Sequence, residues 1–224
     1  MNIEKNEVLR YLGYKDQVLD EGMERLIQEC LAEIQTILKK NYVYQIFDIE
    51  RQEDSIRFKG TDLAFQSRDL SRHLGKSDKC ALMAATLGLE VDKRLAYYSR
   101  LNLTKGIVLD ACATTAIEAL CDEVEEEVRQ EAEKAGYCLT SRYSPGYGDL
   151  SIYYQKDIIT VLQAYSRLGL SLTEDYIMLP RKSVTAFIGW QREEVQADKC
   201  GSVDKCSGCD KKNCLYRKWG KRNG

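Results

Sequence analysis

The spacing of apolar residues predicts several amphipathic helices. Across residues 18–40, apolar side chains recur every three or four positions, which is the period of a helix with one buried and one solvated face. Similar patterns predict helices at residues 90–99, 106–135 and 155–168. Gly136 directly follows the third of these four helices and is the residue type that commonly ends a helix.

Runs rich in β-branched and aromatic residues predict strands between these helices. Residues 42–49 and 55–59 form two such runs, separated by charged residues. Residues 79–87 are apolar and bounded by charge and glycine, which predicts a buried strand. Residues 137–143 predict a further strand, and residues 175–190 predict two more around a Pro-Arg-Lys connection.

The order of the elements indicates the fold class. Along residues 184–189, Val, Ala and Ile alternate with Thr, Phe and Gly, so one face of the last strand should be buried. The strands are spaced as hairpins rather than as parallel crossovers, and helices interleave with them. The pattern therefore favours an α+β fold in which helices flank an antiparallel sheet.

Composition indicates a soluble globular protein. The 224 residues are 44% hydrophobic and carry a formal net charge of −2. The apolar runs at residues 81–89 and 107–113 are too short to cross a membrane, and charges flank both. The first residues lack the apolar core of a secretory signal. We therefore expect a cytoplasmic protein with no membrane partner.

Four of the nine cysteines crowd into a basic segment at the end of the sequence. Between residues 198 and 224, eight Lys and Arg residues accompany three Asp residues, which marks 196–224 as an appendage to a domain of residues 1–195. In a reducing cytosol, this cysteine spacing predicts an iron–sulfur or zinc site rather than disulfides. The predicted ligands are Cys200, Cys206, Cys209 and Cys214. A basic tail with free thiols is the alternative, and nucleic-acid binding is not expected because no folded basic face is evident.

The remaining cysteines, the single histidine and the acidic run favour structural roles. His73 lies in a charged stretch without the partners that a catalytic triad or a two-histidine metal site needs. The acidic run at residues 121–134 is interpreted as a solvated helix face. The five cysteines that lie singly in apolar patterns, where cysteine behaves as a small hydrophobe, are Cys30, Cys80, Cys112, Cys121 and Cys138.

The segment SRYSPGYGD, residues 141–149 and here called the site loop, combines residues suited to ligand binding. Pro145 fixes its own backbone, and Gly146 lets a ligand approach the main chain closely. Arg142 offers a planar set of donors for a carboxylate or phosphate, and Tyr147 offers an aromatic face with a hydroxyl group. A small ligand with a carboxylate at one end and an aromatic ring at the other would fit. A turn with Arg142 in a surface ion pair is the alternative.

Two segments resemble a known family. The run RYSPGY at residues 142–147 matches the Arg-x-x-x-Gly-Tyr signature of the activation domain, which binds S-adenosylmethionine, of cobalamin-dependent methionine synthase. The N-terminal part is similar to stand-alone bacterial versions of this domain, so the resemblance covers about residues 1–195. The run at residues 169–190 is similar to a second conserved segment of that domain, with matches at Gly169, Leu172, Thr173, Glu174, Pro180, Ser183 and Val184.

The resemblance implies a twisted antiparallel sheet that binds S-adenosylmethionine. It also implies a role in reactivation, in which methylation traps the one-electron reduction of oxidised cob(II)alamin. Carried over to this sequence, Arg142 would bind the methionyl carboxylate, Ser144 and Gly146 would contribute backbone groups, and Tyr147 would lie beside the ligand. No catalytic residue is assigned.

The sequence departs from the fused enzymes after Tyr147. Residues 148–151 read Gly-Asp-Leu-Ser where those enzymes carry a Pro-Ala-Cys-Pro type of run, and the N-terminal Asp that contacts the ligand amine has no clear counterpart. Cobalamin, homocysteine and folate modules are not recognised in the sequence. We therefore expect a separate partner that carries the cobalamin, a methionine synthase lacking its own activation domain. A flavodoxin or ferredoxin would be the electron donor.

Two alternative functions remain open from the sequence. The chain could activate another corrinoid methyltransferase by the same chemistry. It could also be a non-catalytic adaptor that acts through the cysteine tail, with the site loop in a purely structural role.

Overall fold

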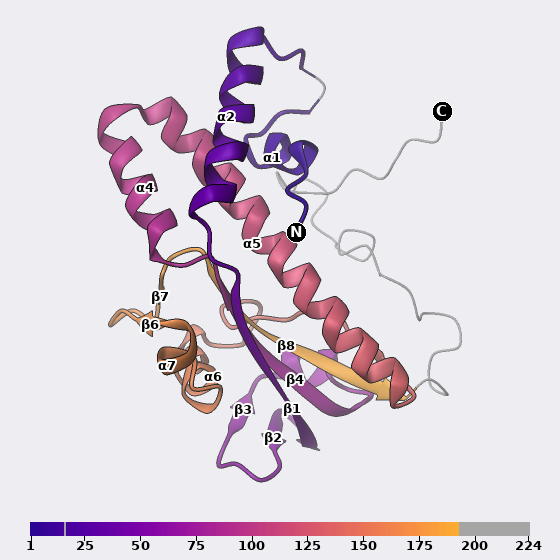
Figure 1. Ribbon diagram of the computed structural model, residues 1–224. Coiled ribbons are helices and arrows are strands. Elements are labelled where there is room, and N and C mark those ends of the chain that lie inside the picture. The colour runs from indigo at the N-terminus through magenta and orange to yellow at the C-terminus, as the bar shows by residue number, and fades with distance from the viewer. Residues whose placement is uncertain (16, 193–224) are drawn as a thin grey trace, which may run out of the picture.

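The computed structural model describes residues 1–192 apart from residue 16, and these residues form an antiparallel sheet with helices on both faces (Figure 1). The strand order of the six-stranded sheet is β3-β2-β1-β4-β8-β5, and every neighbouring pair is antiparallel. The predicted α+β fold is therefore confirmed. The strands of this sheet are β1 (Asn41–Gln52), β2 (Ser55–Phe58), β3 (Ala64–Gln66), β4 (Ser77–Thr86), β5 (Tyr137–Leu139) and β8 (Ser183–Arg192).

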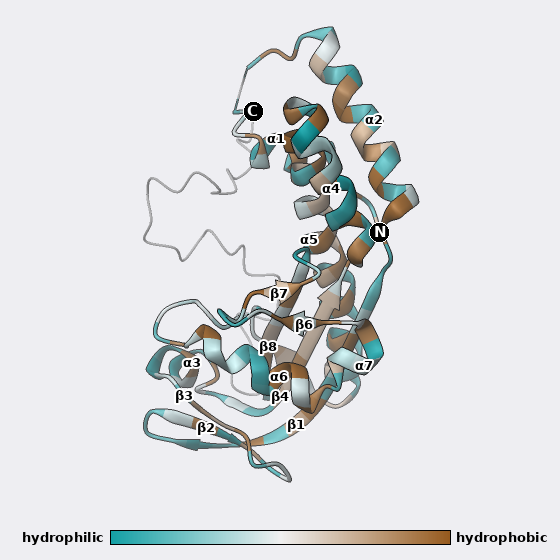
Figure 2. Cartoon of the chain, turned by 90° about the vertical axis from the view of Figure 1, so that its left-hand side faces the viewer, coloured by the Kyte–Doolittle hydropathy of each residue, from teal (hydrophilic) through white to brown (hydrophobic). Residues whose placement is uncertain are grey.

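The helices divide into two groups, one on each face of the sheet. The first group packs around the long α5 and consists of α1 (Lys5–Tyr11), α2 (Glu21–Ile37), α4 (Leu89–Leu101) and α5 (Leu103–Lys134). The second group consists of α3 (Arg68–His73), α6 (Gln155–Val161) and α7 (Ala164–Leu168), preceded by the 3₁₀ turn η1 (Ile152–Tyr154). Figure 2 shows the alternating hydrophobic and hydrophilic stripes along α2 that the sequence predicted.

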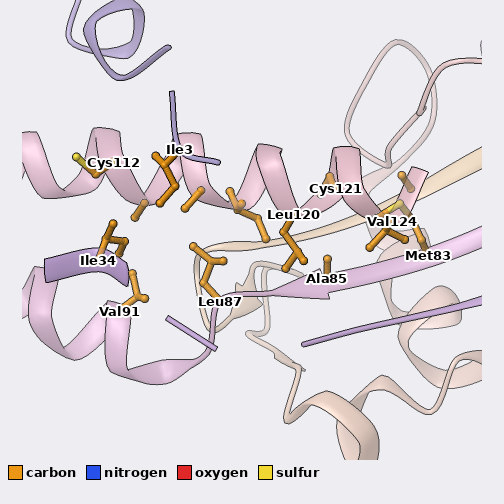
Figure 3. Packing of buried hydrophobic residues seen from close by; sticks show 14 of the residues in the cluster. Ile3, Ile34, Met83, Ala85, Leu87, Val91, Cys112, Leu120, Cys121 and Val124 are labelled. Atoms are coloured by element: carbon orange, nitrogen blue, oxygen red, sulfur yellow. The ribbon is translucent and has the colours of Figure 1, made fainter. Parts of the chain in front are cut away.

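Strand β4 separates two hydrophobic cores. Successive side chains of a strand point to opposite faces, so Met83 and Ala85 enter the core under α5 while Leu82 and Ala84 enter the core on the α3 face. In Figure 3, Met83 and Ala85 lie opposite Leu120 and Val124 of α5. All ten positions of β4 are buried or half-buried, as predicted for residues 79–87.

The single buried face predicted for the last strand was wrong. Residues Thr185 to Gln191 of β8 are all buried, since Ala186 and Ile188 enter one core and Phe187 enters the other. The physical reason is position. Strand β8 lies between β4 and β5, and helices cover both faces of the sheet there.

Three further element predictions needed correction. The helix predicted at residues 155–168 is interrupted, because Gln163 adopts a left-handed backbone with φ of +52° between α6 and α7. The strand predicted at 137–143 ends at Leu139, although Tyr143 still forms a bridge with Phe187. The two short strands β6 (Ser171–Leu172) and β7 (Met178–Leu179) pair with each other, so β7 does not form a hairpin with β8.

The acidic half of α5 is not simply a solvated face. Tyr42 and Tyr44 of β1 donate hydrogen bonds of 2.6 Å to Glu127 and Glu131, and Lys40 lies 3.1 Å from Glu123. These contacts attach the helix to the sheet.

The lone cysteines are buried as predicted. Cys138 is also disulfide-bonded, which the sequence did not suggest. Cys30, Cys80, Cys112 and Cys121 have no exposed surface, and Cys138 is 6% exposed. The predicted ligands Cys200, Cys206, Cys209 and Cys214, and the predicted domain boundary at residue 195, lie outside the described residues.

Within residues 1–15 and 17–192, no helix has the length and apolar character needed to cross a membrane.

Candidate functional site

The site loop leaves the sheet along the edge of β8. The Thr140 amide donates to the Gly189 carbonyl at 2.8 Å, and Tyr143 exchanges two backbone hydrogen bonds with Phe187. Beyond Tyr143 the chain turns tightly, because the Tyr147 amide donates to the Ser144 carbonyl and the Gly146 amide donates to the Leu150 carbonyl at 2.8 Å. The loop predicted from the sequence is therefore attached to β8, a strand in the interior of the sheet.

Gly146 and Gly148 both have positive φ, but their surroundings differ. Gly146 has φ of +91°, and a side chain there would meet nothing closer than Ile152 at 3.7 Å. Gly148 has φ of +54°, and an added Cβ would overlap the Asp69 carboxylate and lie 2.6 Å from the Tyr143 hydroxyl oxygen. A side chain at position 148 would have to displace the Asp69 and Tyr143 side chains, whereas Gly146 is exposed and has room beside its main chain.

Arg142 does not point to the tip of the loop, since its guanidinium group contacts α5. The side chain is 5% exposed and bonds three carboxylates: Glu125 at 2.9 Å, Asp122 at 2.7 Å and Glu118 at 3.3 Å. Burial by itself would lower the pKa of Arg142, but Cys121, Glu125 and Asp122 outweigh that effect and raise it. The alternative expected from the sequence, an ion pair of Arg142, is therefore present. The arginine side chain is buried, however, and not at the surface.

The remaining predicted contacts share one turn. Tyr147, at the tip, is 67% exposed, and the backbone hydrogen bond between Tyr147 and Ser144 places Gly146 inside the turn. The structure therefore brings Ser144, Gly146 and Tyr147 together and directs Arg142 toward α5.

Asp149 joins the far end of the loop to α3. Its carboxylate accepts hydrogen bonds from the Ser67 hydroxyl, from the Arg68 amide at 2.9 Å and from the Asp69 amide at 3.2 Å. The Asp149 amide in turn donates to the Asp69 carboxylate at 3.3 Å. The hydrogen bond from Ser67 is the main reason why the pKa of Asp149 is lowered.

The other end of α3 holds the base of the loop. His73 Nε2 lies 2.7 Å from the Ser141 carbonyl oxygen, and its ring lies 5.1 Å from the ring of Tyr143. The Tyr143 hydroxyl donates to the Tyr147 carbonyl at 3.1 Å. Burial lowers the pKa of His73, so the neutral ring is favoured. The structural role predicted for His73 is confirmed.

Sequence reasoning missed α3 and Asp149 as parts of this site. Ser67 is a residue type that commonly precedes a helix, and its hydroxyl does accept a hydrogen bond from the Leu70 amide. That local signal could have revealed the helix. Nothing local could have paired Asp149 with a helix about 80 residues earlier in the chain.

An exposed apolar surface adjoins the loop. Ile152 and Tyr153 of η1 are 42% and 49% exposed, and the Tyr153 ring lies 4.6 Å from that of Tyr176. Ile177, beside Tyr176, is 52% exposed. Ile152 is also the nearest side chain to Gly146, so this surface continues from the open backbone of the turn. Within the described residues, no group of His, Cys, Asp and Glu side chains is arranged to hold a metal ion.

Residues 65–206 match the family model described as the activation domain of vitamin B12 dependent methionine synthase. The chain belongs to this family. The matched region is more than half of the sequence and includes α3, the site loop and β8. Residues 1–64, which the resemblance in the sequence also covers, lie outside the match.

A solved structure of this activation-domain family has the same fold. It is described as the crystal structure of the MetH reactivation domain bound to AdoHcy. The TM-score is 0.61 at 21% sequence identity, over 78% of this chain and 67% of that chain. This likeness confirms the twisted antiparallel sheet flanked by helices. No curated protein sequence matches the chain.

Proposed function

We propose that this activation-domain protein binds S-adenosylmethionine at the site loop and presents its methyl group to a cobalamin carried by a partner protein. The observation that carries the proposal is that the RYSPGY turn, with its open backbone at Gly146, lies inside the region that matches the family. The related solved domain was crystallised with AdoHcy, the demethylated form of the same ligand.

The geometry of the turn suits the adenosyl part of such a ligand. Gly146 has room for a ligand against its main chain, and Tyr147 offers an exposed ring at the tip. Tyr153 and Tyr176 extend the aromatic surface beyond Ile152. Aromatic faces and backbone groups are the usual means of holding a flat base on an open surface.

Arg142 would bind the methionyl carboxylate by exchanging one of its present partners. Asp122 is the partner most easily replaced, because its side chain is 66% exposed while that of Glu125 is 17% exposed. A ligand carboxylate at this position would form the same charge-assisted hydrogen bonds that Asp122 now forms. Binding would therefore cost the protein one exposed ion pair, which is a small cost.

The protein's part in methyl transfer is to bind and orient. The partner's cobalamin, after one-electron reduction, would take the methyl group from the sulfonium as the carbon–sulfur bond breaks, and S-adenosylhomocysteine would leave. The exposed position of Tyr147 and Ile152 keeps the ligand accessible from outside. Such access is required when the methyl acceptor is carried by another protein.

The partner and the electron source are part of the proposal. The partner would be a cobalamin-dependent methionine synthase without its own activation domain. The electron would come from a flavodoxin or ferredoxin, with Cys200, Cys206, Cys209 and Cys214 as ligands of an iron–sulfur cluster or of zinc. The iron and zinc content of protein purified without oxygen tests this part. One zinc and no iron would exclude an electron relay through the tail.

Titration calorimetry with S-adenosylmethionine tests the binding site. We expect the unaltered protein to bind, Arg142→Ala to bind at least about tenfold more weakly, and Tyr147→Ala to bind several-fold more weakly. Tyr165→Ala is the matched control, since Tyr165 is 72% exposed on α7 and belongs to no part of the proposed site. Absence of binding by the unaltered protein, or undiminished binding by Arg142→Ala, would overturn the proposal.

A further inference from the structure

We propose that Asp149 is a positioning residue, which fixes the ligand-binding turn by attaching it to α3. The expected effect of Asp149 on ligand binding rests on the proposed function. Its expected effect on the loop rests on the geometry alone. Asp149 would not touch the ligand. It would fix the positions of Tyr147 and Gly146 in the ligand-free protein.

The contacts of Asp149 are directed and reciprocal. One carboxylate accepts from a hydroxyl and from two successive backbone amides of α3, while the Asp149 amide donates back to Asp69. Hydrogen bonds to an ionised acceptor are about twice as strong as neutral ones. The backbone donors belong to a helix whose Leu70 is completely buried, so they cannot follow a moving loop.

The loop tip is then restrained from both sides. Only Gly148 separates Tyr147 from Asp149, and Gly148 is packed against both Asp69 and Tyr143. On the other side, the Tyr143 hydroxyl donates to the Tyr147 carbonyl. A displacement of Asp149 would therefore move Tyr147 and release the turn that exposes Gly146.

The restraint is formed by the two residues that follow Tyr147. Gly148 allows the close approach to Asp69 and Tyr143, and Asp149 supplies the acceptor for α3. A preorganised turn loses less conformational entropy when the ligand binds. Releasing the turn should therefore mainly weaken ligand binding.

The experiment compares Asp149→Ala and Asp149→Asn with the control Asp62→Ala, which removes an exposed aspartate from the β2–β3 turn. Hydrogen–deuterium exchange of peptides covering residues 143–151 is measured without ligand, and S-adenosylmethionine binding is measured by calorimetry. Circular dichroism of each variant tests whether the sheet and helices are retained.

We expect Asp149→Ala to exchange faster in residues 143–151, with α5 unchanged, and to bind S-adenosylmethionine about tenfold more weakly, as for the loss of a charge-assisted hydrogen bond. Asp149→Asn should fall between Asp149→Ala and the unaltered protein, because it keeps one acceptor oxygen. Asp62→Ala should match the unaltered protein.

The possible failures are distinguishable. Unchanged exchange in Asp149→Ala would overturn the restraint itself. Faster exchange with unchanged ligand affinity would overturn its role in positioning the site. Failure of the unaltered protein to bind would overturn the proposed function and, with it, the claim that this restraint serves S-adenosylmethionine.

Discussion

The two ends of the site loop are held by opposite kinds of interaction. At the start, Arg142 reaches three carboxylates on one side of α5, and all of its partners are side-chain groups. At the end, Asp149 accepts from a hydroxyl and two backbone amides of α3, and the amides are fixed in place. In the proposed function, a ligand carboxylate would replace a partner of Arg142, whereas at the other end it would have to displace Asp149 itself from α3. The first end is suited to binding and the second to positioning.

Further contacts connect the two ends of the loop. His73 and Tyr143 connect α3 to the base of the loop, and Tyr143 continues to the Tyr147 carbonyl. Helix α3 therefore restrains the loop at two points, while α5 contacts it through Arg142. Substitutions at the α5 end should change ligand affinity because they change the charge around Arg142. Substitutions at the α3 end should change the conformation of the loop.

The largest expected effect is that of Arg142→Ala on stability. The variant leaves three carboxylates without their common cation, and Glu125 among them is only 17% exposed. We expect the free energy of unfolding to fall by about 2 kcal/mol, measured by urea denaturation. Arg142→Lys should recover part of this loss, since lysine keeps the charge and lacks the planar set of donors. A loss of unfolding free energy as small as that of an exposed ion pair would show that the contacts with α5 contribute little to stability.

Gly148→Ala tests the α3 end of the loop, with Gly146→Ala as the matched control. Both positions have positive φ, so both variants carry a backbone penalty of about 1 kcal/mol. Only at Gly148 does the new methyl group collide with Asp69 and Tyr143. We expect Gly148→Ala to cost about 1 kcal/mol more than Gly146→Ala in thermal unfolding. Equal costs would mean that the loop moves away from α3 without resistance.

His73 should make stability depend on pH in a defined direction. Its pKa is lowered from 6.5 by burial, so below pH 6.5 the unfolded chain takes up a proton that the folded protein resists. The resulting stability is fully present above pH 6.5 and is lost as the pH falls through the folded pKa. His73 is the only histidine, so His73→Gln should flatten stability between pH 7 and 5.5 in urea titrations. An unchanged pH profile would exclude this contribution.

Much of the fold followed from periodicity, and the missing parts depend on tertiary contacts. The continuous apolar run in residues 79–87 was sufficient to predict a buried strand, because a strand whose two faces both meet helices is apolar on both faces. The left-handed Gln163 carries no local sequence signal, so one helix was expected where two exist. In the site, the RYSPGY pattern located the turn. The direction of Arg142 could not be predicted, because its partners lie 17 to 24 residues earlier on another element.

The smallest expected effect, and the sharpest test of partner exchange at Arg142, is that of Asp122→Asn. Asp122 is 66% exposed, so the variant should lose about 0.5 kcal/mol of stability. If the ligand carboxylate replaces Asp122, removing this competitor should tighten S-adenosylmethionine binding by a few-fold, within the range expected for one exposed charge pair. Glu126→Gln is the control, since it makes the same change of charge on α5 at a residue that pairs with Arg129. Equal tightening in both variants would indicate that the negative electrostatic field of α5, and not exchange of Asp122, controls binding. Weaker binding in Asp122→Asn would mean that Asp122 assists ligand binding.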